Sequence, residues 1–180
     1  MQAGYQTSGI SYWEHGELVT ARFKDLMNPN QNMTWRLPAW FEQNADWIRK
    51  QLAPNFELIS TYQIWHDCGK SLCRTVDEAG KSHYPDHATL SAQIWQDLGG
   101  DPTIGELIRQ DMLCHQLRPT EAKIFASNPC ALILLVTALC ELHANASMFG
   151  GFQSDSFKIK WKKMDKVGTI ILSHLPKEQS

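Results

Sequence analysis

Residues 131–148, ALILLVTALCELHANASM, are the most apolar stretch of the chain and decide its fold class. The apolar run at 131–140 is shorter than the roughly 20 residues that a membrane-spanning helix needs. It ends in polar residues, so it predicts a helix buried at the centre of a domain. Because buried polar groups need partners, Glu141, His143 and Asn145 are candidates to line a site.

Helix caps and breakers outline further helices on both sides of this stretch. Ser11 is a fair N-cap, Pro38 suits the first turn of a helix, and Thr120 caps a short one. Residues 68–84 are polar and predict a functional loop. Since strand signals are weak throughout, we expect an all-α fold, a compact bundle of about six to eight helices. Besides 131–148, the segments with helical spacing are 12–27, 38–52, 56–67, 85–98, 101–115, 120–125 and 157–175.

The composition is that of an ordinary globular protein, with 43% hydrophobic and 20% charged residues among 180. This length fits a single domain over 1–180, with a core at about 11–148 and a basic C-terminal helix at about 157–175. The formal net charge of −2 argues against attraction of nucleic acid by the molecule as a whole. Five cysteines without a CxxC pair argue against a disulfide framework and favour a reducing, cytoplasmic setting. Residues 1–11 lack the pattern of a signal peptide.

The dipeptide His66-Asp67 ends the predicted helix 56–67, and Gly69 permits the chain to unwind there. An imidazole beside a carboxylate is a mixed nitrogen and oxygen ligand set. Such a set suits manganese, iron, cobalt, nickel or zinc better than calcium. The dipeptide by itself is a weak signal, because it arises by chance in many proteins.

Three further histidines, His15, His87 and His115, lie on separate predicted helices. Facing helices of a bundle can project such side chains into one site in the core. His83 is an alternative to His87 as a ligand. Asp111 lies four residues before His115 and shares its helix face, where we expect it to support the site or to face solvent.

The order of these residues resembles that of the HD superfamily of metal-dependent phosphohydrolases. The resemblance covers about 11–148 and rests on the central HDxGK motif, His66-Asp67-Cys68-Gly69-Lys70. The family usually closes its site with an aspartate on a late apolar helix. At that place this chain has Glu141 by register, with His143 as the other option. The other matching segments are Glu14-His15-Gly-Glu-Leu-Val19, His87-Ala-Thr-Leu-Ser91 and 108–115.

The resemblance implies a centre of one or two divalent transition-metal ions, with magnesium also open. Asp67 would bridge two such ions. Two ions would clamp the attacking and leaving oxygens of a phosphoryl displacement, with a metal-bound water as the nucleophile. The implied ligands are His15, His66, Asp67, His87, His115 and Glu141.

Basic and polar side chains are candidates to hold the substrate. Asp67 and Lys70 are the catalytic candidates, because a cation three residues past Asp67 can neutralise a phosphate oxygen. The basic segment 158–163 could bind a nucleic-acid backbone with Trp161 stacking on a base, or form a solvated helix face. Besides Lys70, the substrate-binding candidates are Arg74, Arg22, Arg118, His143 and Asn145.

Within the superfamily, the HDCGK loop and the helix around Glu141 are most similar to the phosphatase modules that accompany bacterial polynucleotide kinases. We therefore expect hydrolysis of a phosphoester on a nucleotide or nucleic-acid end, with 2′, 3′ or 2′,3′-cyclic phosphates favoured. One alternative is a nucleotide phosphohydrolase, either a 5′-nucleotidase or a deoxynucleoside triphosphohydrolase. The other is a degenerate HD domain that binds without turnover. No membrane partner is expected, and a homodimer stays open.

Overall fold

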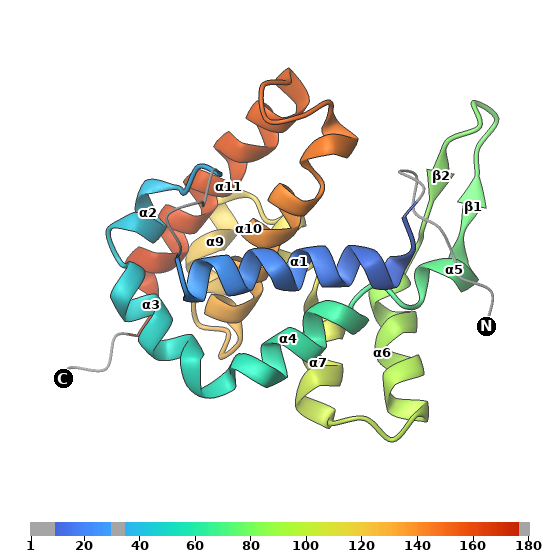
Figure 1. Cartoon of the computed structure of the whole chain (residues 1–180), viewed down its shortest axis with the longest axis horizontal. Coiled ribbons are helices and arrows are strands. Elements are labelled where there is room, and N and C mark those ends of the chain that lie inside the picture. Colours follow the sequence, from blue (N-terminus) through green and yellow to red (C-terminus); the bar gives the residue numbers. More distant parts are fainter. Residues whose placement is uncertain (1–9, 30–34, 177–180) are drawn as a thin grey trace.

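The computed structural model describes residues 10–29 and 35–176, which fold almost entirely as helices (Figure 1). The prediction of an all-α fold is confirmed, because eight of the described helices have seven or more residues. The short strands β1 (Thr75–Val76) and β2 (Ser82–His83) pair as an antiparallel hairpin. The α-helices are α1 (Tyr12–Met27), α2 (Ala39–Glu42), α3 (Ala45–Leu52), α4 (Phe56–Trp65), α5 (Lys70–Cys73), α6 (His87–Asp97), α7 (Pro102–Gln110), α8 (Leu113–Gln116), α9 (Pro119–Phe125), α10 (Ala131–Ala144) and α11 (Asp155–His174). Two 3-10 helices, η1 (Ala53–Asn55) and η2 (Ala146–Phe149), complete the described elements.

The apolar helix α10 lies in the core, where Leu134, Leu135 and Leu139 are almost completely buried. Each such side chain contributes about 1.5–3 kcal/mol when it leaves water. Helices α1, α8 and α11 pack against α10, and α1 also packs on α4. Figure 1 shows α1 crossing the middle of the molecule, with the β1–β2 hairpin projecting beyond its N-terminal end. No helix of the described residues has the length and apolar character needed to cross a membrane.

Helix α1 begins where its capping residues predict. The Glu14 amide donates to the Ser11 hydroxyl at 3.1 Å, and the Ser11 amide donates to the Glu14 carboxylate at 2.6 Å. This reciprocal capping box satisfies two amides that have no partner within the helix, and such a cap contributes about 1 kcal/mol. His15, in the same first turn, lies on the buried face of the helix.

Two predicted helices are broken in the structure. Segment 38–52 divides at Gln43 and Asn44, where the Asn44 side-chain amide donates to the Trp40 carbonyl at 2.8 Å and competes with the helix ladder. Segment 101–115 divides into α7 and α8 at Asp111. Periodicity alone did not reveal either break, because the apolar positions keep their helical spacing across it.

Two local predictions need correction. Thr120 is not the cap of α9, because Pro119 occupies the first helical position and Arg118 precedes it. The predicted loop 68–84 contains α5 and the hairpin. Asp77 holds the hairpin turn, since its carboxylate accepts from the amides of Ala79 at 3.0 Å and Lys81 at 2.9 Å.

Candidate metal centre

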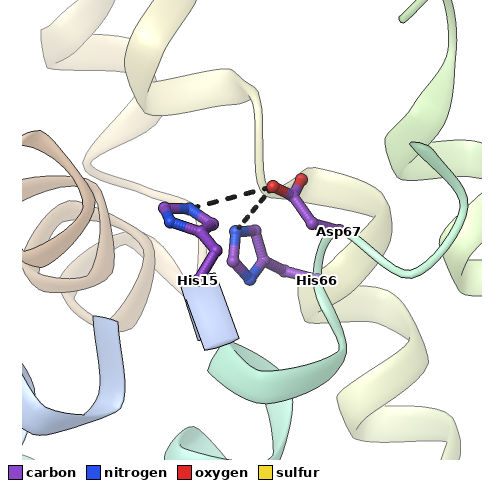
Figure 2. Close-up of side chains that lie close together, drawn as sticks. All are labelled: His15, His66 and Asp67. Atoms are coloured by element: carbon purple, nitrogen blue, oxygen red, sulfur yellow. Dashed lines mark ion pairs between the residues drawn. The ribbon is translucent and has the colours of Figure 1, made fainter. Parts of the chain in front are cut away.

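The HD dipeptide follows α4 directly and meets histidines from two other helices, α1 and α6. His66 Nε2 and His15 Nε2 lie 3.4 and 3.8 Å from the same oxygen of Asp67 (Figure 2). His87 Nε2, from the first residue of α6, lies 3.5 Å from the other Asp67 oxygen. These four side chains are all buried.

A second carboxylate extends this cluster. Glu141 on α10 places one oxygen 3.9 Å from His66 Nε2 and 3.2 Å from His115 Nε2. His66 therefore lies between Asp67 and Glu141. The structure brings together all six side chains that the HD resemblance implied as ligands.

Two glycines allow the elements of the centre to approach each other. A Cβ on Gly16 would lie 2.7 Å from the Ile64 backbone, so glycine lets α1 pack closely on α4 and bring His15 beside His66. A Cβ on Gly69 would lie 2.7 Å from the Ser91 amide nitrogen. Gly69 has an ordinary helical backbone conformation, with φ −77 and ψ −16. Its role is therefore close packing of the HD loop on α6 and not the backbone freedom expected from the sequence.

The histidines are oriented as metal-binding histidines usually are. His66 Nδ1 donates to the Gln63 carbonyl at 2.6 Å, and His87 Nδ1 donates to the Tyr84 carbonyl at 2.9 Å. A bond of this kind directs the lone pair of Nε2 towards the centre. The Nε2 atoms of His66, His87 and His115 lie 3.2–3.5 Å from carboxylate oxygens of Asp67 or Glu141 but make no well-aligned hydrogen bond with the described residues. His66 Nε2 lies between the two carboxylates, while His87 Nε2 lies beside Asp67 and His115 Nε2 beside Glu141. A divalent cation bound beside either carboxylate would have imidazole nitrogens within reach as ligands.

Asp111 is a third carboxylate of the centre, which the sequence predicted either to support the site or to face solvent. It is 2% exposed, so it does not face solvent. The Tyr62 hydroxyl donates to Asp111 Oδ1 at 2.5 Å, while Oδ2 is buried without a hydrogen-bond partner among the described residues. Its position continues the buried face of α7, three residues after Ile108, and that spacing was the signal for its burial.

Ligand atoms of the centre form two groups whose members lie within 4.8 Å of one another. One group is His15, His66 and Asp67, and the other is His66, Asp111 and Glu141. Nitrogen and carboxylate donors at this spacing fit a borderline divalent transition metal. The chain can therefore offer ligands for a metal ion at either position.

The charges of the centre are strongly coupled. Burial would lower the pKa of His66, but Asp67, Asp111 and Glu141 outweigh it and raise that pKa to about 10. Burial, together with Glu141, raises the pKa of Asp111 to about 7. For Glu141, His115 and His66 outweigh the effect of burial and lower its pKa to about 2. Buried negative charge thus retains a proton on His66, and a divalent cation would replace that proton.

A cavity of about 480 Å³ opens onto one side of the centre. His87, His115 and Glu141 line it, as do Lys70 and Asn145. The Lys70 ammonium donates to Asp67 at 2.5 Å, which keeps a positive charge at the junction between cavity and centre.

His143 does not belong to this centre, although the sequence offered it as a ligand and as a substrate contact. Successive residues of a helix are rotated by about 100°, so positions 141 and 143 face nearly opposite sides of α10. The ring of His143 lies 4.3 Å from that of Trp35, and its nitrogens lie 2.9 and 3.1 Å from the carbonyl oxygens of Leu139 and Arg36. Of these two residues of α10, Glu141 is therefore the one that joins the cluster around His66.

Three predicted arginine contacts also lie elsewhere in the described structure, outside the lining of the cavity. Arg22 pairs with Asp25 at 3.5 Å. Arg74 donates to the Ser82 hydroxyl at 3.1 Å within the hairpin. The side chain of Arg118 is exposed at the start of α9.

Two remaining alternatives are resolved by local contacts. His83 lines the cavity, but it pairs with Asp77 at 2.7 Å, and His87 is the histidine beside Asp67. Trp161 is buried and stacks on Phe157 with ring centroids 6.2 Å apart. It is therefore not available to stack on a nucleic-acid base.

Comparisons of the chain with protein-family models, with curated proteins and with solved structures found no match. The chemistry of the centre and of the cavity beside it is therefore the basis for inferring a function.

Proposed function

We propose that the chain is a metal-dependent phosphohydrolase of the HD type. The observation that carries the proposal is that four histidines from separate parts of the chain, His15, His66, His87 and His115, lie around the buried carboxylates of Asp67 and Glu141. Among the described residues, His87 Nε2, Asp111 Oδ2 and Glu141 Oε1 are buried without a hydrogen-bond partner, which would cost free energy in a purely structural cluster.

The residues of the chain have distinct tasks in this proposal. The histidines and carboxylates of the centre would hold one or two divalent ions of manganese, iron, cobalt, nickel, zinc or magnesium. Such an ion supplies a water of lowered pKa and polarises a phosphoryl oxygen. Lys70, between Asp67 and the cavity, holds a phosphate oxygen and offsets the charge that develops there.

The reaction is the hydrolysis of a phosphoester. Water adds to phosphorus, the ester P–O bond breaks, and the leaving oxygen takes up a proton. A monoester yields inorganic phosphate and an alcohol, and a cyclic diester yields a ring-opened monoester. We propose a nucleotide or a nucleic-acid end as the substrate, with 2′, 3′ or 2′,3′-cyclic phosphates favoured.

The test is hydrolysis of a generic aryl phosphate by metal-stripped protein to which one ion at a time is returned. We expect at least one ion to restore activity at one or two equivalents per chain. Asp67→Ala abolishes this activity, while His174→Ala, which removes an exposed histidine at the end of α11, retains it. Activity that survives Asp67→Ala would overturn the proposal. Protein that neither binds an ion nor hydrolyses the phosphate would overturn it as well, and a domain that binds without catalysis would then be the better account.

A further inference from the structure

Two lysines of α11 line the cavity on which the metal centre opens. Lys160 and Lys163 share this lining with His87, His115 and Glu141, although they are far from these residues in the sequence. The same helix buries Met164 and Val167 against the core. The packing of α11 therefore determines which of its lysines face the cavity.

Both lysines are held in place by specific contacts. The Lys163 ammonium donates to the backbone carbonyl of His115 at 2.7 Å. The Lys160 ammonium lies 4.8 Å from the centre of the Phe149 ring, a cation–π distance. Lys163 is thus tied to the backbone of a candidate metal ligand, and two of its three donors remain for another acceptor.

Cationic side chains outnumber anionic ones in the cavity lining. Among the described residues of its lining, Lys70, Lys160 and Lys163 are cationic, and Glu141 alone carries a carboxylate. Glu141 is already engaged by His66 and His115. A single phosphate at the metal centre would use Lys70, so the two lysines of α11 offer positive charge to a second anion.

Part of the cavity lining is apolar. Met112, Leu142, Phe149, Met164 and Val167 all line the same cavity. Its volume of about 480 Å³ lies within the usual range for small-molecule sites, about 300–1,000 Å³. The cavity thus combines a metal centre, an apolar wall and a second cationic position.

We propose that Lys160 and Lys163 form a subsite for a second phosphate of the substrate, one that is bound and not cleaved. This inference rests on the proposed function, because it assigns the first phosphate to the metal centre. The preferred substrates then carry two phosphates on one nucleoside unit. A nucleoside bisphosphate and the phosphorylated end of an oligonucleotide both have this chemistry.

The experiment compares kcat/KM for adenosine 3′-monophosphate, adenosine 5′-monophosphate, adenosine 3′,5′-bisphosphate and a 3′-phosphorylated adenosine dinucleotide. We expect the substrates with two phosphates to be preferred. In Lys160→Ala/Lys163→Ala this preference falls about tenfold, which is the effect of losing two partly exposed ion pairs. Comparison of the dinucleotide with the bisphosphate shows whether the subsite accepts the phosphodiester of an oligonucleotide or the second phosphate of a free nucleotide.

Charge-matched and conservative variants serve as controls. Lys162→Ala/Lys166→Ala removes two exposed lysines of the same helix that do not line the cavity, and it keeps the preference. Lys160→Arg/Lys163→Arg also keeps it, because the positive charge remains. A preference that is equal in the wild type and the Lys160→Ala/Lys163→Ala variant would refute the subsite, as would the absence of any preference.

A binding measurement separates failure of the subsite from failure of the proposed function. Calorimetric titration with adenosine 3′,5′-bisphosphate gives its affinity for the wild type and for the Lys160→Ala/Lys163→Ala variant. Affinity that falls in the variant supports the subsite even if no substrate is hydrolysed, a result that would overturn only the proposed function. Equal affinity of the two proteins would overturn the subsite.

Discussion

The close approach of α1 and α4 makes Gly16 a sensitive position in this protein. In Gly16→Ala, the new Cβ would lie 2.7 Å from both Ile64 Cα and the Ile64 carbonyl oxygen, and 2.8 Å from the Gln63 carbonyl oxygen. These atoms belong to the backbone of a helix, so no side chain can rotate away. The two helices must separate to accommodate the methyl group.

The size of the effect follows from this geometry. Overpacking of a well-packed core costs about 1–3 kcal/mol, which exceeds the roughly 0.5–1 kcal/mol that alanine contributes over glycine inside a helix. A net loss of about 1 kcal/mol lowers the melting temperature by about 2–4 °C for a chain of this length. The separation also moves His15 away from His66, whose ring centroids are 5.3 Å apart, so metal affinity falls as well.

The assay is urea unfolding of the metal-free protein, with metal affinity measured by competition with a chelator. The control is Gly105→Ala in α7, where the new Cβ would meet only Trp95 Cδ1 at 3.4 Å, an ordinary contact. This control should be as stable as the wild type or more stable. If Gly16→Ala is no less stable than Gly105→Ala, the steric reasoning is wrong.

Three further predictions concern the charges of the centre. Tyr62→Phe removes the hydroxyl that donates to Asp111, and we expect about 10–100-fold weaker metal binding, measured by competition with a chelator. Unchanged metal affinity would show that Asp111 does not contribute to metal binding. Glu141→Gln lowers the bound metal per chain, while His143→Gln, on the other side of α10, retains it, as elemental analysis can show; the opposite result would make His143 the late ligand. The raised pKa of His66, about 10, means that its contribution to stability is present below about pH 6.5 and is lost as pH rises towards 10. Metal-free protein should therefore lose stability over this range in urea unfolding, and metal binding at pH 8 should release a proton, seen as a dependence of the binding enthalpy on the buffer.

Much of the fold was predictable from local sequence because its signals are local. The Ser11 cap, the apolar run of α10 and the glycine pair after α6 act within a few residues, so the predicted helices 12–27 and 85–98 closely match α1 and α6. The order of the histidines also indicated a shared site, because helices of a bundle face a common core.

The tertiary structure decided which side chains actually meet. Whether Glu141 or His143 joins His66 depends on the rotation of α10 against its neighbours, and the hydroxyl that hydrogen-bonds to Asp111 lies 49 positions away in the sequence. The position of Lys160 and Lys163 beside the centre likewise depends on how α11 packs. Periodicity along a chain indicates which face of a helix is buried, but only packing between distant segments determines what that face contacts.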